Sequence, residues 1–262
     1  MLSLKKLFLF TLISLVSSST TPKQDETRVV NGKDAKTGQF PYQALVIVHL
    51  ANGQSALCGG SLLSSEWILT AGHCVEEAKS FNITLGSIAL GSQNEDVGRI
   101  VLNSEEFIRH EDYNAGSASN DIAVIKLPEK VTFTDNIQPV KLASDKDSFA
   151  RQKVIVSGFG QQKDGGNVAQ NLQYAELEVI TNTQCMLVYG PLAIKSSSIC
   201  ARGPNGESAC HGDSGGPLVL EQDKTQVGVV SFGHLVGCEK SIPVVYARVT
   251  EFREWIKEKT GV

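Results

Sequence analysis

A histidine, an aspartate and a serine, each inside a short motif, could together perform nucleophilic catalysis. The motifs are residues 69–74 (LTAGHC), 120–124 (NDIAV) and 210–217 (CHGDSGGP), in that order along the chain. A serine hydroxyl is a weak nucleophile at neutral pH, so it needs a base to take its proton and a carboxylate to fix the tautomer of that base. We therefore predict Ser214 as nucleophile, His73 as general base and Asp121 as the residue that orients His73.

The glycines around Ser214 indicate a sharp backbone turn. Such a turn would expose the hydroxyl and aim the amides of Gly212 and Ser214 at one point, which would form an oxyanion hole. In enzymes with related chemistry, removal of one hydrogen-bond donor from the oxyanion hole lowers kcat by roughly 10²–10³-fold. These glycines are therefore expected to serve catalysis as well as backbone conformation.

Each candidate also has a simpler interpretation when taken alone. A histidine at the end of an apolar strand is often a core residue, and an aspartate often caps a turn. Residues 212–216 also match the G-x-S-x-G elbow of α/β-hydrolases, a fold in which the acid and the histidine follow the serine. Only His234 follows Ser214 here, so the order of the motifs argues against that fold.

The elements that would position these residues are predicted to be many short strands. Apolar, often β-branched runs of strand length occupy residues 44–50, 67–71, 122–127, 154–156 and 227–231. Glycine, asparagine and serine punctuate the intervals, a pattern typical of an all-β barrel or sandwich. One helix is expected at the C-terminus, where Phe252, Trp255 and Ile256 recur at helical spacing and Thr250 could cap.

The N-terminus indicates export. Residues 1–18 combine a basic start, a short apolar run and small residues, which predicts a signal peptide. That run is too short to cross a bilayer, which takes about 20 residues. Residues 19–28 are polar and end in Arg28, before an abrupt change to the apolar Val29, which predicts an activation propeptide. Residues 29–262 would then form one secreted domain.

The remaining composition excludes several classes of protein. The net charge is −4 and no stripe of arginine and lysine appears, so we expect no nucleic-acid partner. No later apolar run is long enough for a membrane span. Six cysteines suit three disulfides in an oxidising compartment, although their spacing leaves the pairing open. None has C-x-x-C spacing, so neither metal nor cofactor is expected. Asn82 begins a glycosylation sequon.

The three motifs, in this order, resemble the trypsin and chymotrypsin family of serine proteases, and the similarity extends from Val29 to the C-terminal helix. The resemblance implies two antiparallel six-stranded β-barrels with the active site between them. It also implies a chymotrypsin-like endopeptidase that works through an acyl-enzyme, and a monomer whose partners are protein or peptide substrates and protein protease inhibitors. The implied disulfides follow the three-disulfide pattern of invertebrate members: Cys58 to Cys74, Cys185 to Cys200 and Cys210 to Cys238.

The resemblance further implies activation by cleavage. Residues 29–32 (VVNG) match the start of a mature protease of this family. A cut after Arg28 would free the α-amino group of Val29, which is mostly charged near neutral pH and could pair with a buried Asp213. That pair would hold the oxyanion loop in place. An enzyme with an apolar pocket would not cut after Arg28 itself, so a trypsin-like protease is the expected activator.

The resemblance places a neutral substrate pocket next to Ser214. The residues expected to form it are Ser208, Ala209, Ser231, Phe232, Gly233 and Val244. The only nearby acid, Glu207, falls one position too early, so cleavage after phenylalanine, tyrosine or leucine is expected rather than after arginine or lysine. His211 and Tyr246 could contact substrate, but a loop position and plain core packing explain them equally well. The family's calcium loop usually has a carboxylate where this chain has Ser87, so calcium is not expected.

Three alternatives remain open at this stage. Val244, where the family often has glycine, narrows the pocket and leaves an elastase-like preference possible. The short, cysteine-free segment before Arg28 favours a digestive enzyme over a regulatory or venom protease. A non-catalytic homologue is disfavoured because all three motif residues are present.

Overall fold

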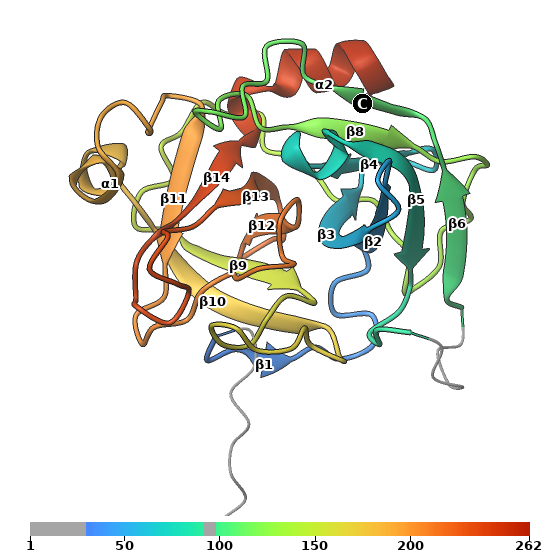
Figure 1. The fold of residues 1–262 in the computed structure, drawn as a ribbon, viewed down its shortest axis with the longest axis horizontal. Helices are drawn as coiled ribbons and strands as arrows, with labels where there is room; N and C mark the ends of the chain where they lie inside the picture. Colours follow the sequence, from blue (N-terminus) through green and yellow to red (C-terminus); the bar gives the residue numbers. More distant parts are fainter. Residues whose placement is uncertain (1–29, 92–97) are drawn as a thin grey trace, which may run out of the picture.

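The first half of the protein folds into an antiparallel β-barrel (Figure 1). The computed structural model describes residues 30–91 and 98–262, so the predicted signal peptide, propeptide, Arg28 and Val29 lie outside the described residues. The strands of this first barrel are β2 (Gln43–Leu50), β3 (Ser55–Leu62), β4 (Trp67–Thr70), β5 (Ala78–Leu85), β6 (Ile100–Ser104), β7 (Phe107–Arg109) and β8 (Ala123–Lys126).

The first barrel closes through a bent strand. Hydrogen bonding gives the strand order β6-β5-β2-β3-β4-β8-β7. β6 pairs with β5 and β7 pairs with β8, and only Glu105 and Glu106 separate β6 from β7 along the chain. When β6 and β7 are counted as one bent strand, six strands close the barrel, as the family resemblance implies.

The second half forms a second six-stranded barrel beside the first (Figure 1). Its strands are β9 (Lys153–Gly158), β10 (Gln173–Ile180), β11 (Ser198–Arg202), β12 (Pro217–Leu220), β13 (Gln226–Phe232) and β14 (Val244–Arg248). The order β10-β11-β14-β13-β12-β9 is closed by pairing of β9 with β10. The short β1 (Lys33–Asp34) adds to β10, so the start of the described chain lies on the second barrel.

The helices match the sequence prediction only in part. The C-terminal helix α2 (Arg253–Thr260) is confirmed, but the prediction that Thr250 caps it was wrong. Thr250 is buried in a preceding 3₁₀ turn, η2 (Val249–Glu251), and Phe252 occupies the cap position without a side-chain bond. A second helix, α1 (Asn182–Tyr189), was missed. In the described part of the chain, no helix combines the length and apolar character needed to cross a membrane.

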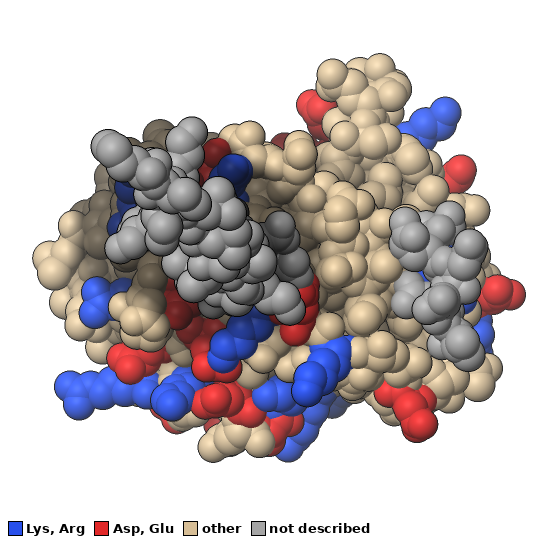
Figure 2. Space-filling model, turned by 90° about the horizontal axis from the view of Figure 1, so that it is seen from below, with Lys and Arg blue, Asp and Glu red and all other residues tan. Residues whose placement is uncertain are grey.

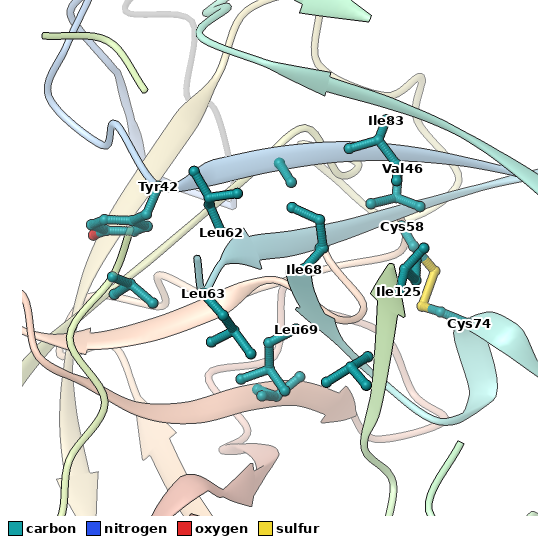
Figure 3. Packing of buried hydrophobic residues seen from close by; sticks show 14 of the residues in the cluster. Tyr42, Val46, Cys58, Leu62, Leu63, Ile68, Leu69, Cys74, Ile83 and Ile125 are labelled. Carbon is teal, nitrogen blue, oxygen red and sulfur yellow. A yellow bond between two sulfur atoms is a disulfide. The ribbon is translucent and has the colours of Figure 1, made fainter. Parts of the chain in front are cut away.

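Branched side chains fill the interior of the first barrel (Figure 3). Val46, Ile68, Ile83 and Ile125 come from four different strands and are fully buried. Burial of each such side chain contributes about 1.5–3 kcal/mol. Gly60 must lack a side chain because a Cβ there would lie 2.7 Å from Cγ2 of Ile68. The packed core thus gives a rigid base for the loops at its edge.

Two buried polar pairs join the barrels. The hydroxyl of Ser61 in the first barrel donates to Oε1 of Gln226 in the second at 2.7 Å. In the opposite sense, the hydroxyl of Ser157 in the second barrel donates to Oε1 of Gln43 in the first, also at 2.7 Å. Because buried polar groups are costly without partners, these pairs fix how the barrels meet. Figure 2 shows the face of the molecule that lies below in the view of Figure 1, and basic and acidic side chains are interspersed on it.

Candidate active site

The pairing of β4 with β8 brings His73 to Asp121. Thr70, at the end of β4, pairs with Ala123 at the start of β8. His73 begins the 3₁₀ turn η1 (His73–Val75) just after β4, and Asp121 lies two residues before the start of β8. Residues that are 48 apart in sequence therefore lie side by side at one edge of the first barrel.

Asp121 holds His73 by two bonds. Its Oδ2 lies 2.9 Å from Nδ1 of the ring, and its Oδ1 accepts from the backbone amide of His73 at 2.8 Å. A proton on Nδ1 completes the first bond and leaves Nε2 free to accept another proton, which is the tautomer that a general base needs. The ring keeps about a third of its surface exposed, at 32%.

The carboxylate of Asp121 is buried yet stays ionised. Only 2% of its surface is exposed, and the hydroxyl of Ser231 donates to Oδ2 at 2.5 Å. Burial alone would raise the pKa of Asp121, but the hydrogen bonds from His73 and Ser231 outweigh it and hold that pKa below its usual value. The neighbouring Asn120 has a positive φ of 53°, a strained conformation often found at functional sites.

The backbone of Ser214 contacts the first barrel across the barrel interface. It lies in the loop between β11 and β12, and its carbonyl accepts from the amide of Gly59 in the first barrel at 2.7 Å. The same carbonyl lies 3.6 Å from Sγ of Cys74, the residue next to His73. In the residues that the structure covers, the ring of His73 bonds to Asp121 and not to the hydroxyl of Ser214. Catalytic bonds of this kind often tighten only when substrate is bound.

The loop at Ser214 leaves two amides free. Gly212 and Gly215 have φ values of 98° and 80°, which glycine adopts without strain. The neighbouring amide of Asp213 is already hydrogen-bonded, because it donates to the carbonyl of Cys210 at 3.0 Å. The amides of Gly212 and Ser214 donate to no other residue within the described ranges. Both are therefore available for an oxyanion.

Asp213 points the other way, into the second barrel. It is 1% exposed, and its carboxylate accepts from the amides of Gly160 at 2.8 Å and Cys210 at 2.9 Å. Burial raises the pKa of Asp213 to about 6, against the opposing effect of these two bonds. No cationic group among the described residues pairs with it. Val30, the first described residue, is buried nearby, and its carbonyl accepts from Ser208 at 3.3 Å.

A pocket of about 330 Å³ opens beside Ser214. All six residues expected to form it do line it: Ser208, Ala209, Ser231, Phe232, Gly233 and Val244. The lining also includes residues that sequence reasoning did not assign to the pocket, namely Val230, His234, Leu235, Gly237 and Ile242. His211, left open from the sequence, lines it too, whereas Tyr246 is fully buried behind it.

The pocket lining is neutral. Within the described residues it contains no aspartate, glutamate, lysine or arginine. Glu207 is turned away, because its carboxylate accepts from the backbone amide and the side chain of Asn205 at 2.7 and 3.0 Å. Burial alone would raise the pKa of Glu207, but these bonds hold it below its usual value.

The structure contains the three disulfides that the resemblance implies: Cys58–Cys74, Cys185–Cys200 and Cys210–Cys238. The first anchors the turn that carries His73, and the last joins the two walls of the pocket. Two groups of neighbouring side chains of metal-ligating type include Cys58 with Cys74 and Cys210 with Cys238. The sulfurs of these disulfides offer no thiolate to a metal ion. Asn82, the predicted glycosylation site, lies on β5 with a partly exposed side chain.

Two β-barrels that place a histidine–aspartate pair opposite a serine beside a pocket define the class of chymotrypsin-like serine endopeptidases. The family model described as Trypsin matches residues 29–256 of this chain. The chain therefore belongs to the trypsin family, and it is a serine endopeptidase that acts on protein substrates.

Known relatives cover most of the chain. It is 43% identical to "Collagenase" of Hypoderma lineatum over 90% of this chain and 89% of the relative. It is 36% identical to "Brachyurin" of Leptuca pugilator, over 89% and 99% of the two chains. Identity to "Chymotrypsin-2" of Vespa crabro is 34%, over 88% and 99%. A solved structure titled HL collagenase superposes with a TM-score of 0.82 at 41% identity, covering 89% of this chain and 99% of that one.

Proposed function

We propose that this chain is secreted as a zymogen and that the mature enzyme cleaves peptide bonds after large or medium apolar residues. The observation that carries the proposal is the neutral pocket beside Ser214. Ser208 lines it, and Val230 and Val244 add apolar surface. A substrate arginine or lysine would need a carboxylate there. Phenylalanine, tyrosine or leucine would instead bury apolar surface in the pocket.

The chemistry follows from the arrangement around Ser214. As the hydroxyl attacks the substrate carbonyl carbon, His73 Nε2 takes its proton, and the amides of Gly212 and Ser214 stabilise the negative charge on the carbonyl oxygen. His73 then gives the proton to the leaving amine as the carbon–nitrogen bond breaks. Water, deprotonated by His73, hydrolyses the acyl-enzyme in the same way, and Asp121 keeps the ring oriented throughout.

Activation is proposed to follow cleavage after Arg28 by a trypsin-like protease. The new α-amino group of Val29 would pair with the buried carboxylate of Asp213. That carboxylate accepts from two backbone amides and has no cationic partner among the described residues. The position of Val30 supports this, since its carbonyl already accepts from Ser208 in the same region. Only after pairing would the oxyanion loop be held firmly.

The cellular role is proposed from the features outside the site. The predicted signal peptide and three disulfides support secretion. We propose a digestive role for a monomer that protein protease inhibitors would bind. An elastase-like preference is the nearest alternative, because Val244 occupies part of the pocket wall.

Collagen is a second candidate substrate. The observation that favours it is the 43% identity to the Hypoderma lineatum protein named "Collagenase", together with the TM-score of 0.82 to the HL collagenase structure. Incubation of the active enzyme with fibrillar collagen, followed by gel electrophoresis, tests this candidate. Collagen chains that stay intact while denatured gelatin is degraded would remove it.

The central experiment is to activate recombinant zymogen with trypsin, remove the trypsin and profile the cleavage of a peptide library. Ser214→Ala, treated identically, controls for residual trypsin. We expect cuts after phenylalanine, tyrosine and leucine, and labelling of the active chain by a fluorophosphonate. A profile dominated by arginine and lysine would contradict the proposed specificity, and cleavage that survives Ser214→Ala would contradict the mechanism.

A further inference from the structure

The loop that joins β9 to β10 touches both walls of the substrate pocket. We call residues 161–168 the Asp164 loop. One wall of the pocket is residues 208–214 and the other is residues 233–244. The amide of Gln161, at the start of the loop, donates to the carbonyl of His211 on the first wall at 2.7 Å. Gln161 also pairs with Val168, so the loop is a small hairpin attached to that wall.

The tip of the Asp164 loop is bonded to the second wall. Oδ1 of Asp164 accepts from the amide of Cys238 at 2.7 Å, and the amide of Asp164 donates to Oε2 of Glu239 at 2.9 Å. These partners are 74 and 75 residues away in sequence, so the bonds are not those of a local turn. The approach depends on Gly237, because a Cβ there would overlap the Asp164 carboxylate.

Most of the second wall lies outside the strands, although Tyr189 donates to the carbonyl of Pro243 and packs on the ring of His234. Pairing of β13 with β14 ends at Phe232 and Val245, and of the described residues between them only Val244 pairs with a strand, at Ala201 of β11. The Cys210–Cys238 disulfide joins this wall to the first one. The bond from Cys238 to Asp164 meets the wall at the same residue, and a carboxylate oxygen of Asp164 lies within 4.8 Å of the sulfur atoms of Cys210 and Cys238. The Asp164 loop therefore forms a second, non-covalent link between the walls.

We propose that Asp164 is a positioning residue for specificity, whose carboxylate sets the width of the pocket by holding the wall at Cys238. The inference rests on the proposed function, since it assumes that the pocket receives the substrate side chain. A charged acceptor suits this role, because hydrogen bonds to a carboxylate are shorter and stronger than those to a neutral group. Asp164 itself does not line the pocket and does not touch the substrate.

The test compares three variants of the full chain after activation. Asp164→Ala removes the acceptor for Cys238. Asp164→Asn keeps an oxygen in the same place. Asp223→Ala is the matched control, since Asp223 also accepts a backbone amide, that of Thr225 at 3.0 Å, in a turn that does not line the pocket. The first readout is the kinetics of cleavage of peptides that carry phenylalanine, leucine or alanine immediately before the cleaved bond. The second readout is hydrogen exchange of the backbone amides of residues 236–240.

For Asp164→Ala we expect the KM of the phenylalanine and leucine substrates to rise about tenfold, the size of one lost charge-assisted bond. We expect kcat to change by less than about threefold, because His73 and Asp121 lie on the other barrel and keep their bonds. The preference for phenylalanine over alanine should shrink, and the amide of Cys238 should exchange faster. Asp164→Asn should restore most of the KM, and Asp223→Ala should match the parent chain.

The outcomes separate this inference from the proposed function. The burst of nitrophenol from nitrophenyl acetate counts the active Ser214 without using the pocket. A parent chain that gives no burst would refute the proposed function. A normal burst with unchanged KM and selectivity in Asp164→Ala would overturn only the inference, as would a KM loss that Asp164→Asn does not reduce or that Asp223→Ala shares.

Discussion

At the residue scale, the proposed mechanism depends on groups that are held from several sides. Asp121 binds both the ring and the backbone amide of His73, and Ser231 from the other barrel binds Asp121. Each of these donors faces a carboxylate oxygen, so a neutral amide could not satisfy all of them. The ionised form of Asp121 is therefore part of the geometry as well as of the electrostatics.

Asp121→Asn should separate the two contributions. The backbone amide of His73 can only donate, so the oxygen of the introduced amide stays toward it and the NH₂ group faces the ring. The His73 ring is therefore driven to the tautomer whose Nε2 already carries a proton. We expect kcat to fall by about 10⁴, the effect of this substitution in the family's reference triad, with the fold retained. Peptide hydrolysis and thermal unfolding measure the two quantities. A fall of less than tenfold would show that Asp121 does not orient the base.

Asp213 should make the stability of the zymogen depend on pH. Its pKa is about 6, against an ordinary value of 3.8, because it is buried. The folded chain therefore holds this proton more tightly than the unfolded chain, so the contribution is fully present below about pH 4 and is lost as pH rises through 6. The loss should be about 2–3 kcal/mol.

Urea unfolding of the zymogen at pH 4, 5, 6 and 7 checks this dependence against Asp213→Asn. The asparagine variant cannot titrate at this position, so the stability of the parent relative to the variant should decrease with rising pH. A difference that is constant from pH 4 to 7 would contradict the prediction.

The sequence could predict that His73 and Asp121 meet and that the pocket lies beside Ser214, because each proposed catalytic role requires a particular side chain in a short local pattern. Asp164, Leu235 and Ile242 could not be predicted, since their positions depend on how the loops fold against one another. No local pattern marks them. The bond from Asp164 to Cys238 joins residues 74 apart, and nothing in the spacing of either residue indicates it.

At the element scale, the short strands were predictable and the first helix was not. α2 has apolar residues on one face, but the apolar residues of α1 are spread around the helix, and Leu187 is 84% exposed. A capping box of Thr181 and Gln184 was the one signal that could have revealed α1. The helix instead depends on the Cys185–Cys200 disulfide, which joins it to β11.

Two disulfides of nearly equal span allow a matched comparison between elements. Cys58–Cys74 and Cys185–Cys200 close 16 and 15 residues, so removal of either by paired alanine substitutions should cost about 3 kcal/mol of stability through chain entropy. Only Cys58–Cys74 anchors the turn that carries His73 and contacts the carbonyl of Ser214.

We therefore expect the variant without Cys58–Cys74 to lose at least tenfold in kcat, a cost of misplacing a catalytic group. The variant without Cys185–Cys200 should stay within about threefold of the parent, because its bonds lie outside the catalytic turn. Urea unfolding and peptide hydrolysis measure both. Equal losses of kcat in the two variants would show that the first disulfide does not position His73.

At the scale of the whole molecule, the site exists only where the barrels meet. The first barrel supplies His73 and Asp121, and the second supplies Ser214 and the pocket. Neither barrel alone contains all residues of the proposed site, so the proposed mechanism requires that the barrels keep their relative position. The buried bonds from Ser61 to Gln226 and from Ser157 to Gln43 cross this interface.

The interface bonds should therefore matter for both stability and activity. Ser61→Ala and Ser157→Ala each leave a buried glutamine oxygen without its donor, so each should lower the free energy of unfolding by about 1–3 kcal/mol. Lys33→Ala, which removes an exposed ion pair with Glu176, should lower it by less than about 1 kcal/mol. When Ser61→Ala and Ser157→Ala are combined, the barrels can shift, so kcat should fall. The burst amplitude with nitrophenyl acetate should still count every folded molecule. Unchanged kcat in a double variant of reduced stability would show that packing of the apolar residues alone aligns the barrels.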